Sequence, residues 1–158
     1  MKPSILIVDD EPLIRQALVR ALSGEVYELL QAPGGREALN ILTARSVDLI
    51  LSDLVMPEMD GLALLKQARV VRPEALRIVL TGHADLDLAV RAINDGAVYR
   101  FLLKPWDSFD LRVMIKLALR HKTTQRDREQ VSGRERSDTE PTAIFPPMTA
   151  AGGTTPQA

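Results

Sequence analysis

The sequence contains no cysteine, no long apolar run and almost no net charge, and each absence excludes a class of protein. Without cysteine the chain can hold no disulfide scaffold, no thiolate metal site and no cysteine nucleophile. No apolar run approaches the roughly 20 residues that span a bilayer, and Asp9 and Asp10 come too early for a signal peptide. A formal net charge of −1 over 158 residues argues against a protein that wraps nucleic acid or an anionic membrane. We therefore expect a cytoplasmic segment that binds neither nucleic acid nor membrane directly.

What the first 122 residues do contain is a regular alternation of two hydrophobic patterns. Amphipathic segments of helical period follow each of five short apolar runs. Turn formers close three of these segments: Gly24 follows the first, Pro73 the third and Gly96 the fourth. The pattern predicts an α/β fold, (βα)5, with a doubly wound parallel sheet covered on both faces. The five apolar runs are residues 5–8, 27–30, 49–51, 78–80 and 99–103.

The composition changes near residue 122, and we place a domain boundary there. Residues 1–122 are predicted to form the folded domain. Residues 123–158 are predicted to extend the last helix and then to become a disordered tail or linker, since their end is rich in Pro, Thr, Ala and Gly. His121 is expected at a helix C-terminus, where a cation is favoured.

Polar side chains stand where four of the five predicted strands end. The first strand ends in Asp9 and Asp10, the third in Asp53 and the fourth in Thr81, and the fifth runs into Lys104. The carboxyl ends of parallel strands meet at one edge of a sheet, where sites form at the switch in strand order. Any one of these residues alone is more simply a helix cap, a turn former or a surface side chain. Their occurrence at successive strand ends favours a functional site.

Three carboxylates in one place need a counter-charge. At an effective dielectric near 20, two unit charges 4 Å apart cost roughly 4 kcal/mol. Lys104 offsets one charge, and a cluster of oxygen ligands suits Mg²⁺. A partly coordinated cation keeps positions open for phosphate oxygens, and an Asp carboxylate can act as a nucleophile toward phosphorus. The residues therefore provide the parts needed to phosphorylate Asp53.

Residues 4–121 resemble the receiver domain of bacterial two-component response regulators. The resemblance lies in the stretches ILIVDDE (5–11), DLILSDLVMP (48–57), MDG (59–61), TG (81–82) and KP (104–105). It implies the flavodoxin-like strand order 2-1-3-4-5. It also implies that the domain is no turnover enzyme, but a phosphoacceptor that catalyses only its own phosphoryl transfer and dephosphorylation.

The resemblance assigns a role to each of these side chains. Asp53 would accept a phosphoryl group from a cognate histidine kinase or phosphotransfer protein. Thr81 would hydrogen-bond the phosphoryl group and Lys104 would pair with it. The Lys104–Pro105 bond resembles one that is cis in the family. Mg²⁺ would be held by Asp9, Asp10, Asp53 and the backbone carbonyl of Val55.

The family also suggests how phosphorylation would be transmitted. Phe101 matches an aromatic residue that turns inward when Thr81 moves, although core packing alone would also explain it. The output surface would comprise the helix near residues 85–95, the strand near residues 98–103 and the last helix. It would control a partner, self-association as a homodimer or an attached output domain. Val55 and His83 depart from many relatives and would change the dephosphorylation rate, although His83 could instead be a plain surface residue.

Three other readings compete with the receiver. A haloacid-dehalogenase-like phosphatase also uses an Asp nucleophile and Mg²⁺, but it places the nucleophile at the end of the first strand. A flavodoxin-like cofactor site needs a Ser/Thr/Gly-rich phosphate loop after that strand, where this chain has acidic residues. An interaction module that has lost phosphorylation would not need the acidic set and Lys104. The sequence does not decide whether the chain is a stand-alone receiver or a piece of a longer protein. It also does not identify the cognate kinase or the output.

Overall fold

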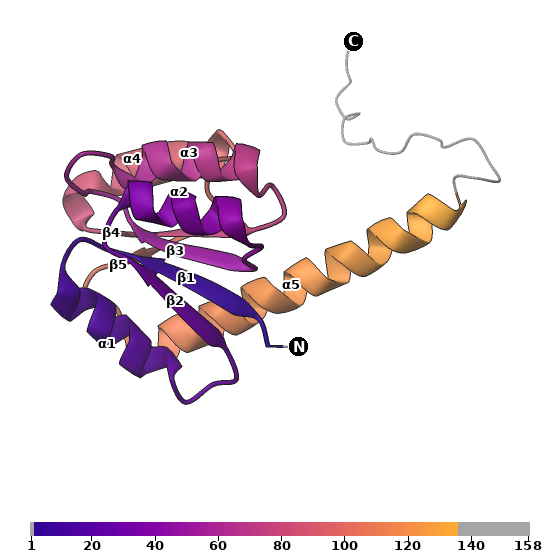
Figure 1. The fold of residues 1–158 in the computed structure, drawn as a ribbon, viewed down its shortest axis with the longest axis horizontal. Helices are drawn as coiled ribbons and strands as arrows, with labels where there is room; N and C mark the ends of the chain where they lie inside the picture. The colour runs from indigo at the N-terminus through magenta and orange to yellow at the C-terminus, as the bar shows by residue number, and fades with distance from the viewer. Residues whose placement is uncertain (1, 136–158) are drawn as a thin grey trace, which may run out of the picture. The chain divides into compact units, whose positions relative to one another are not determined.

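The computed structural model describes residues 2–135 and contains one five-stranded parallel sheet (Figure 1). The strand order is β2-β1-β3-β4-β5, which confirms the predicted α/β fold and the flavodoxin-like order. All four pairings between neighbouring strands are parallel. The strands are β1 (Ser4–Val8), β2 (Glu28–Ala32), β3 (Leu49–Asp53), β4 (Leu76–Thr81) and β5 (Arg100–Leu103).

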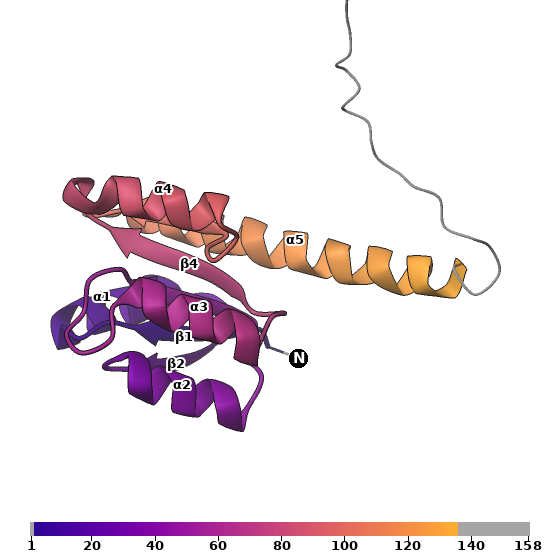
Figure 2. The same cartoon turned by 90° about the horizontal axis from the view of Figure 1, so that it is seen from above.

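Helices cover both faces of the sheet (Figures 1 and 2). Helices α2, α3 and α4 pack on one face and enclose one apolar core with Leu6, Ile50 and Val79. Helix α1 and the first part of α5 pack on the other face, over Ile5 and Ile78. The helices are α1 (Pro12–Leu22), α2 (Gly35–Ala44), α3 (Gly61–Val71), α4 (Leu86–Asn94), α5 (Ser108–Glu135) and a short 3₁₀ helix η1 (His83–Asp85).

The central strands are continuous apolar runs because both of their faces are buried. Every residue of β1 and β3 is buried. Successive side chains of a strand point to opposite faces, so Ile5 and Ile7 enter the core under α1 and α5 while Leu6 and Val8 enter the other. Edge strand β2 is only partly buried. This difference accounts for the weaker apolar pattern of β2.

The turn residues end and begin helices for identifiable reasons. Pro12 occupies the start of α1, where its missing N–H costs no hydrogen bond. The Asp60 carboxylate accepts a hydrogen bond of 2.7 Å from the Ala63 N–H and caps α3. Gly96 follows α4 with φ +80°, a conformation that glycine adopts without a steric penalty.

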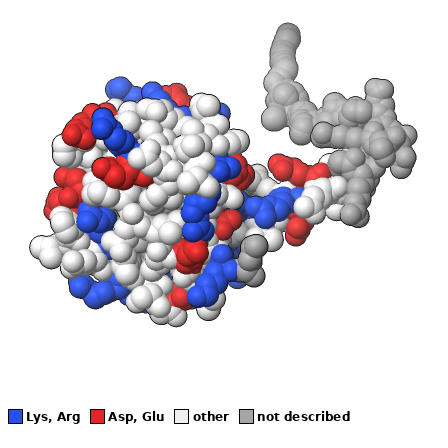
Figure 3. All heavy atoms as spheres, in the orientation of Figure 1, with Lys and Arg blue, Asp and Glu red and all other residues white. Residues whose placement is uncertain are grey.

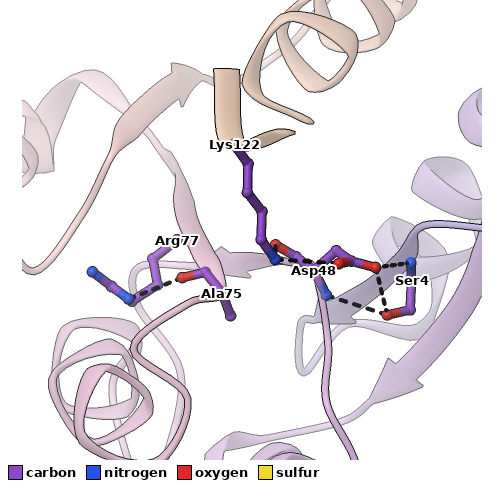
Figure 4. A network of polar contacts seen from close by, with 5 residues as sticks. All are labelled: Ser4, Asp48, Ala75, Arg77 and Lys122. Carbon is purple, nitrogen blue, oxygen red and sulfur yellow. Dashed lines mark hydrogen bonds and ion pairs between the residues drawn. The ribbon is translucent and has the colours of Figure 1, made fainter. Parts of the chain in front are cut away.

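At the amino ends of the strands, a polar network joins three segments (Figure 4). The Asp48 carboxylate accepts a 2.8 Å hydrogen bond from the Ser4 N–H and lies 3.2 Å from Lys122 Nζ. Burial raises the pKa of Asp48, but the bonds from Ser4 and Lys122 outweigh it, so this pKa is lowered overall. The network fixes Lys122 of α5 to the loop before β3 and to the start of β1. Nearby, the Arg77 guanidinium donates to the Ala75 carbonyl at 2.9 Å.

The chain divides after Lys122 into two units, Met1–Lys122 and Thr123–Ala158. Helix α5 continues without a break to Glu135, so the expectation that His121 stands at a helix C-terminus is wrong. The charged residues after it extend the helix although they carry no apolar stripe. The predicted tail from residue 136 onward lies outside the described residues. Within the described part, no helix is both long and apolar enough to cross a bilayer.

Basic and acidic side chains are interspersed on the face of residues 2–122 that Figure 3 shows. No broad patch of one sign is visible there. This distribution fits the balanced count of 20 basic and 21 acidic residues.

Candidate functional site

The predicted site residues come together at the carboxyl edge of the sheet. Asp53 is the last residue of β3 and Thr81 the last of β4, while Asp9 and Lys104 directly follow β1 and β5. Strand β3 lies between β1 and β4, and Asp53 is aligned with Leu80 of β4. The strand order therefore brings together residues from four parts of the sequence.

Three carboxylates form the centre of this edge. Oxygen atoms of Asp9, Asp10 and Asp53 all lie within 4.8 Å of one another. Asp9 is fully buried and Asp53 is 6% exposed, while Asp10 is more accessible. Burial lowers the local dielectric and strengthens the repulsion among these groups. The cluster is therefore unfavourable by itself and favours a cation.

Lys104 supplies one positive charge to the cluster. Its Nζ lies 2.8 Å from Asp53 Oδ1. The side chains of Lys104 and Asp53 are 27% and 8% exposed respectively, so the lysine is the more accessible partner of the pair. The Lys104–Pro105 bond is cis, as the resemblance implied, and the Lys104 N–H donates to the Thr81 carbonyl at 2.8 Å.

Asp9 is the least solvated carboxylate of the three. Its Oδ1 accepts a 2.9 Å hydrogen bond from the Glu11 N–H. Its Oδ2 is buried and has no hydrogen-bond partner within the described residues. Burial raises the pKa of Asp9 to about 6, with smaller upward contributions from Asp53 and Asp10 and downward ones from the Glu11 N–H and Lys104.

These observations fit a divalent cation with oxygen ligands. A buried oxygen without a partner is costly unless a donor or a cation satisfies it. The donor set contains carboxylates and no nitrogen or sulfur ligand, a set that suits Mg²⁺ better than zinc or copper. Asp9, Asp10 and Asp53 therefore form a candidate metal site.

The loop after β3 borders the cluster and is held by backbone bonds. The Leu54 N–H donates to the Leu80 carbonyl at 3.0 Å, and the Gly61 N–H donates to the Leu54 carbonyl at 2.8 Å. Val55 lies in this loop, two residues past Asp53, with its side chain 58% exposed. His83 begins η1 after β4 and is exposed.

Thr81 and Phe101 lie on neighbouring strands and share one face of the sheet. Thr81 is 1% exposed, and its hydroxyl donates to the Gly82 carbonyl at 3.2 Å. Phe101 is aligned with Val79, and Thr81 with Leu103, so Phe101 is the diagonal neighbour of Thr81 on the same face. Phe101 is half-buried and packs against the core under α2, α3 and α4.

The structure adds one residue that the sequence analysis did not single out. The Arg15 guanidinium, on α1, donates from Nη1 to the Asp9 backbone carbonyl at 2.6 Å. The available signal was a basic residue near the start of a helix, where the helix dipole disfavours a cation. That position could have pointed to a local acceptor for Arg15, but not to which acceptor.

Comparison with known proteins assigns this chain to a family. Residues 5–116 match the response regulator receiver domain family. The chain is 43% identical over 115 residues to the DNA-binding transcriptional regulator NtrC of Klebsiella pneumoniae, a match that covers 73% of this chain and 24% of that protein. The corresponding match to NtrC of Escherichia coli K12 is 39% over 127 residues, covering 80% and 27%. The chain thus spans about a quarter of the length of these curated relatives.

Solved structures give the same assignment. The signal receiver domain of an HD domain-containing protein from Pseudomonas fluorescens Pf-5 superposes with a TM-score of 0.75 and 42% identity, covering 80% of this chain and 93% of that one. A response regulator receiver domain protein from Clostridium thermocellum superposes with a TM-score of 0.73 and 33% identity, covering 78% and 98%.

The fold is that of a receiver domain, a phosphoacceptor in signalling. The chain belongs to the response regulator receiver domain family. It is therefore part of a two-component signalling system that works through phosphorylation.

Proposed function

We propose that Asp53 is the phosphoacceptor of this domain and that Lys104, Thr81 and Mg²⁺ assist the transfer. The observation that carries the proposal is the 2.8 Å ion pair between Lys104 Nζ and Asp53 Oδ1 at the three-carboxylate cluster. A lysine that pairs with the acceptor carboxylate stands where it can also pair with a phosphoryl oxygen. Asp53 lies at the end of its strand, at the edge where doubly wound sheets bind ligands.

The phosphodonor would be a phosphohistidine of a cognate histidine kinase or phosphotransfer protein. An Asp53 carboxylate oxygen attacks phosphorus, an O–P bond forms and the N–P bond to the imidazole breaks. The released imidazole nitrogen takes up one proton, and Asp53 becomes an acyl phosphate. Lys104 pairs with the transferred group, and the Thr81 hydroxyl turns from the Gly82 carbonyl to donate to a phosphoryl oxygen.

Asp9, Asp10 and Asp53 would hold Mg²⁺, with the Val55 carbonyl as a further ligand. Bound there, the ion would offset the charge of the carboxylates and of the phosphoryl oxygens. The unpartnered Oδ2 of Asp9 supports this assignment, because a buried carboxylate oxygen needs a partner.

Val55 and His83 would set the lifetime of the acyl phosphate. Val55 is 58% exposed and lies two residues after Asp53, and His83 is exposed two residues after Thr81. An apolar side chain at Val55 neither orients nor donates to an attacking water, whereas an imidazole can do both. These two side chains would therefore act on hydrolysis more than on phosphoryl transfer.

Phosphorylation would be transmitted through Thr81 and Phe101 to the α4–β5–α5 surface. A phosphoryl group adds about −1.5 to −2 charges, which would draw the Thr81 hydroxyl toward it. The space that Thr81 vacates on the shared sheet face would admit Phe101. The surface that would respond carries exposed apolar side chains: Leu88 at 41%, Val113 at 37% and Leu117 at 56%.

Three kinds of output could use this surface: a separate partner, a second copy of the domain, or an attached output domain. The matched relatives are named as DNA-binding transcriptional regulators and are much longer than the matched region. A phosphorylation-dependent change of affinity at the α4–β5–α5 surface is common to all three outputs.

Incubation with acetyl phosphate and Mg²⁺, followed by intact mass measurement and light scattering, tests the proposal. We expect the mass of one phosphoryl group to be added to the wild-type domain and to be absent from Asp53→Asn. Asp127→Asn removes the same charge at an exposed position of α5 and should be phosphorylated normally. Full phosphorylation of Asp53→Asn would overturn the assignment of the acceptor, and light scattering would show whether the second-copy output operates.

A further inference from the structure

We propose that Arg15 is a positioning residue of the metal site, because it fixes the peptide group that joins Asp9 to Asp10. This inference rests on the proposed function of the three carboxylates as a Mg²⁺ site. Arg15 Nη1 lies 2.6 Å from the Asp9 carbonyl oxygen. That carbonyl belongs to the peptide whose orientation sets the direction in which the chain leaves Asp9 and enters Asp10.

The other parts of this turn are already fixed by hydrogen bonds that do not involve the Arg15 side chain. The Asp9 N–H donates to the Ala32 carbonyl at 3.3 Å, and the Glu11 N–H donates to Asp9 Oδ1 at 2.9 Å. The N–H groups of Ile14 and Arg15 both donate to the Glu11 carbonyl at 3.1 Å. Arg15 adds the bond to the Asp9 carbonyl, so its guanidinium completes the fixation of the turn between β1 and α1.

The position of Arg15 is not explained by a salt bridge or by the helix itself. In the part of the chain that the structure describes, the Arg15 guanidinium pairs with no carboxylate. The residue lies near the N-terminus of α1, where the helix dipole disfavours a cation. Its side chain is half-buried, and the bond to the Asp9 carbonyl is the interaction that accounts for its placement.

Metal ligands need outer partners that hold them in the geometry the ion requires. Loss of such a partner typically weakens metal affinity by about 10- to 100-fold. The oxygens of Asp9, Asp10 and Asp53 lie within 4.8 Å of one another, so a rotation of the Asp9–Asp10 peptide would move Asp10 relative to the other two. Arg15 would therefore act on the metal through the turn.

A purely electrostatic role for Arg15 predicts the opposite sign. A cation near three carboxylates repels a second cation, so loss of the charge alone would strengthen Mg²⁺ binding. Loss of the bond to the Asp9 carbonyl would weaken Mg²⁺ binding. The direction of the change distinguishes the two roles.

The experiment measures binding of Mn²⁺ as a Mg²⁺ substitute by the EPR signal of the free ion, with Mg²⁺ competition, on folded protein. Arg15→Met keeps much of the apolar stem and removes the donor. We expect it to weaken Mn²⁺ binding by about 10-fold. Arg20→Met makes the same change at an exposed position of the same helix and should bind within about twofold of wild type.

The phosphorylation rate with acetyl phosphate gives a second readout. Arg15→Met should need about 10-fold more Mg²⁺ for half-maximal rate and recover a near-wild-type rate at saturation. A lesion in folding alone would not shift the Mg²⁺ dependence in this way. Unchanged or tighter Mn²⁺ binding by folded Arg15→Met would overturn the inference.

Two further variants complete the design. If Arg15→Met does not fold, Arg15→Gln decides, because it removes the guanidinium and its charge and leaves a shorter polar side chain. Weaker Mn²⁺ binding by Arg15→Gln supports positioning, and unchanged or tighter binding contradicts it. Asp10→Asn should abolish specific binding. If wild type itself binds no Mn²⁺, the proposed metal site fails; if wild type binds and the Arg15 variants match it, only the inference about Arg15 fails.

Discussion

Gly61 lies so close to the backbone of Asp53 that a Cβ at Gly61 would stand 2.0 Å from the Asp53 carbonyl oxygen. The contact brings the start of α3 against the end of β3, where the Gly61 N–H donates to the Leu54 carbonyl at 2.8 Å. Only a residue without a side chain fits between the helix and the acceptor strand. The Gly61 position thus couples the packing of α3 to the placement of Asp53.

Gly61→Ala should therefore destabilise the domain and slow phosphorylation. Overpacking against rigid backbone costs about 3 kcal/mol of unfolding free energy. Urea unfolding with the rate of acetyl phosphate incorporation measures both effects. Gly24→Ala is the matched control, because a Cβ at Gly24 would meet no atom within 4 Å. Equal stability of the two variants would contradict this account of the contact.

Asp9→Asn should stabilise the metal-free protein at neutral pH and not at acid pH. The pKa of Asp9 is raised from 3.8 to about 6 by burial, so the folded state favours the protonated form. Protonation of Asp9 therefore stabilises the folded state; this stabilisation is complete below pH 3.8 and is lost as the pH rises through 6. Asp9→Asn removes the buried charge, so it should raise the free energy of unfolding by about 3 kcal/mol at pH 8 and by almost nothing at pH 3.5.

Urea unfolding in EDTA at both pH values measures this difference, with Asp127→Asn as the exposed control. A gain from Asp9→Asn that is equal at pH 3.5 and pH 8 would show that burial does not raise the pKa of Asp9.

Lys122→Met should weaken the attachment of α5 at the amino edge of the sheet. The Lys122 side chain is 11% exposed and lies 3.2 Å from Asp48 Oδ1, so we expect a loss of about 1 kcal/mol at pH 7. Because the pKa of Asp48 is lowered, the ionised carboxylate stabilises the folded state above pH 3.8, and this stabilisation is lost as the pH falls through the folded-state pKa of Asp48. The difference in unfolding free energy between Lys122→Met and wild type should shrink over the same pH range.

Lys116→Met provides the comparison in thermal or urea unfolding. Lys116 is 55% exposed and lies 3.3 Å from Glu25, so its loss should cost less than that of Lys122. A larger effect at Lys116 would count against the network around Asp48.

Val55→Asn should change the lifetime of the acyl phosphate. An amide at this exposed position can orient or block the hydrolytic water, which valine cannot do by hydrogen bonding. The half-life after removal of the phosphodonor measures the effect, with Val70→Asn, 82% exposed on α3, as control. An unchanged half-life in Val55→Asn would remove Val55 from the rate-setting residues.

The sequence allowed the fold and the grouping of the site to be predicted because both depend on short-range patterns. The apolar runs identify the strands, and parallel pairing places all strand ends on one edge. Asp9, Asp53 and Thr81 could thus be grouped before any distance was known. The strand order came from resemblance to the receiver family, since periodicity does not determine which strands are neighbours.

The remaining features depend on distances between separate elements. The bond from Arg15 to the Asp9 carbonyl and the approach of Gly61 to Asp53 follow from how α1 and α3 dock on the sheet. The end of α5 could not be located from the sequence, because residues 123–135 show little apolar periodicity: an extension of the helix after residue 122 was expected, yet His121 was placed at a helix C-terminus. The pairing of Lys122 with Asp48 joins residues 74 positions apart, and their charges alone could not identify it.

Reductive trapping of the phosphorylated domain tests the central claim most directly. After reaction with acetyl phosphate and Mg²⁺, borohydride converts an aspartyl phosphate to homoserine, which peptide mass mapping locates. The account predicts homoserine at position 53 alone. Homoserine at Asp9 or Asp10, or a phosphoryl mass gain with no homoserine at 53, would contradict it.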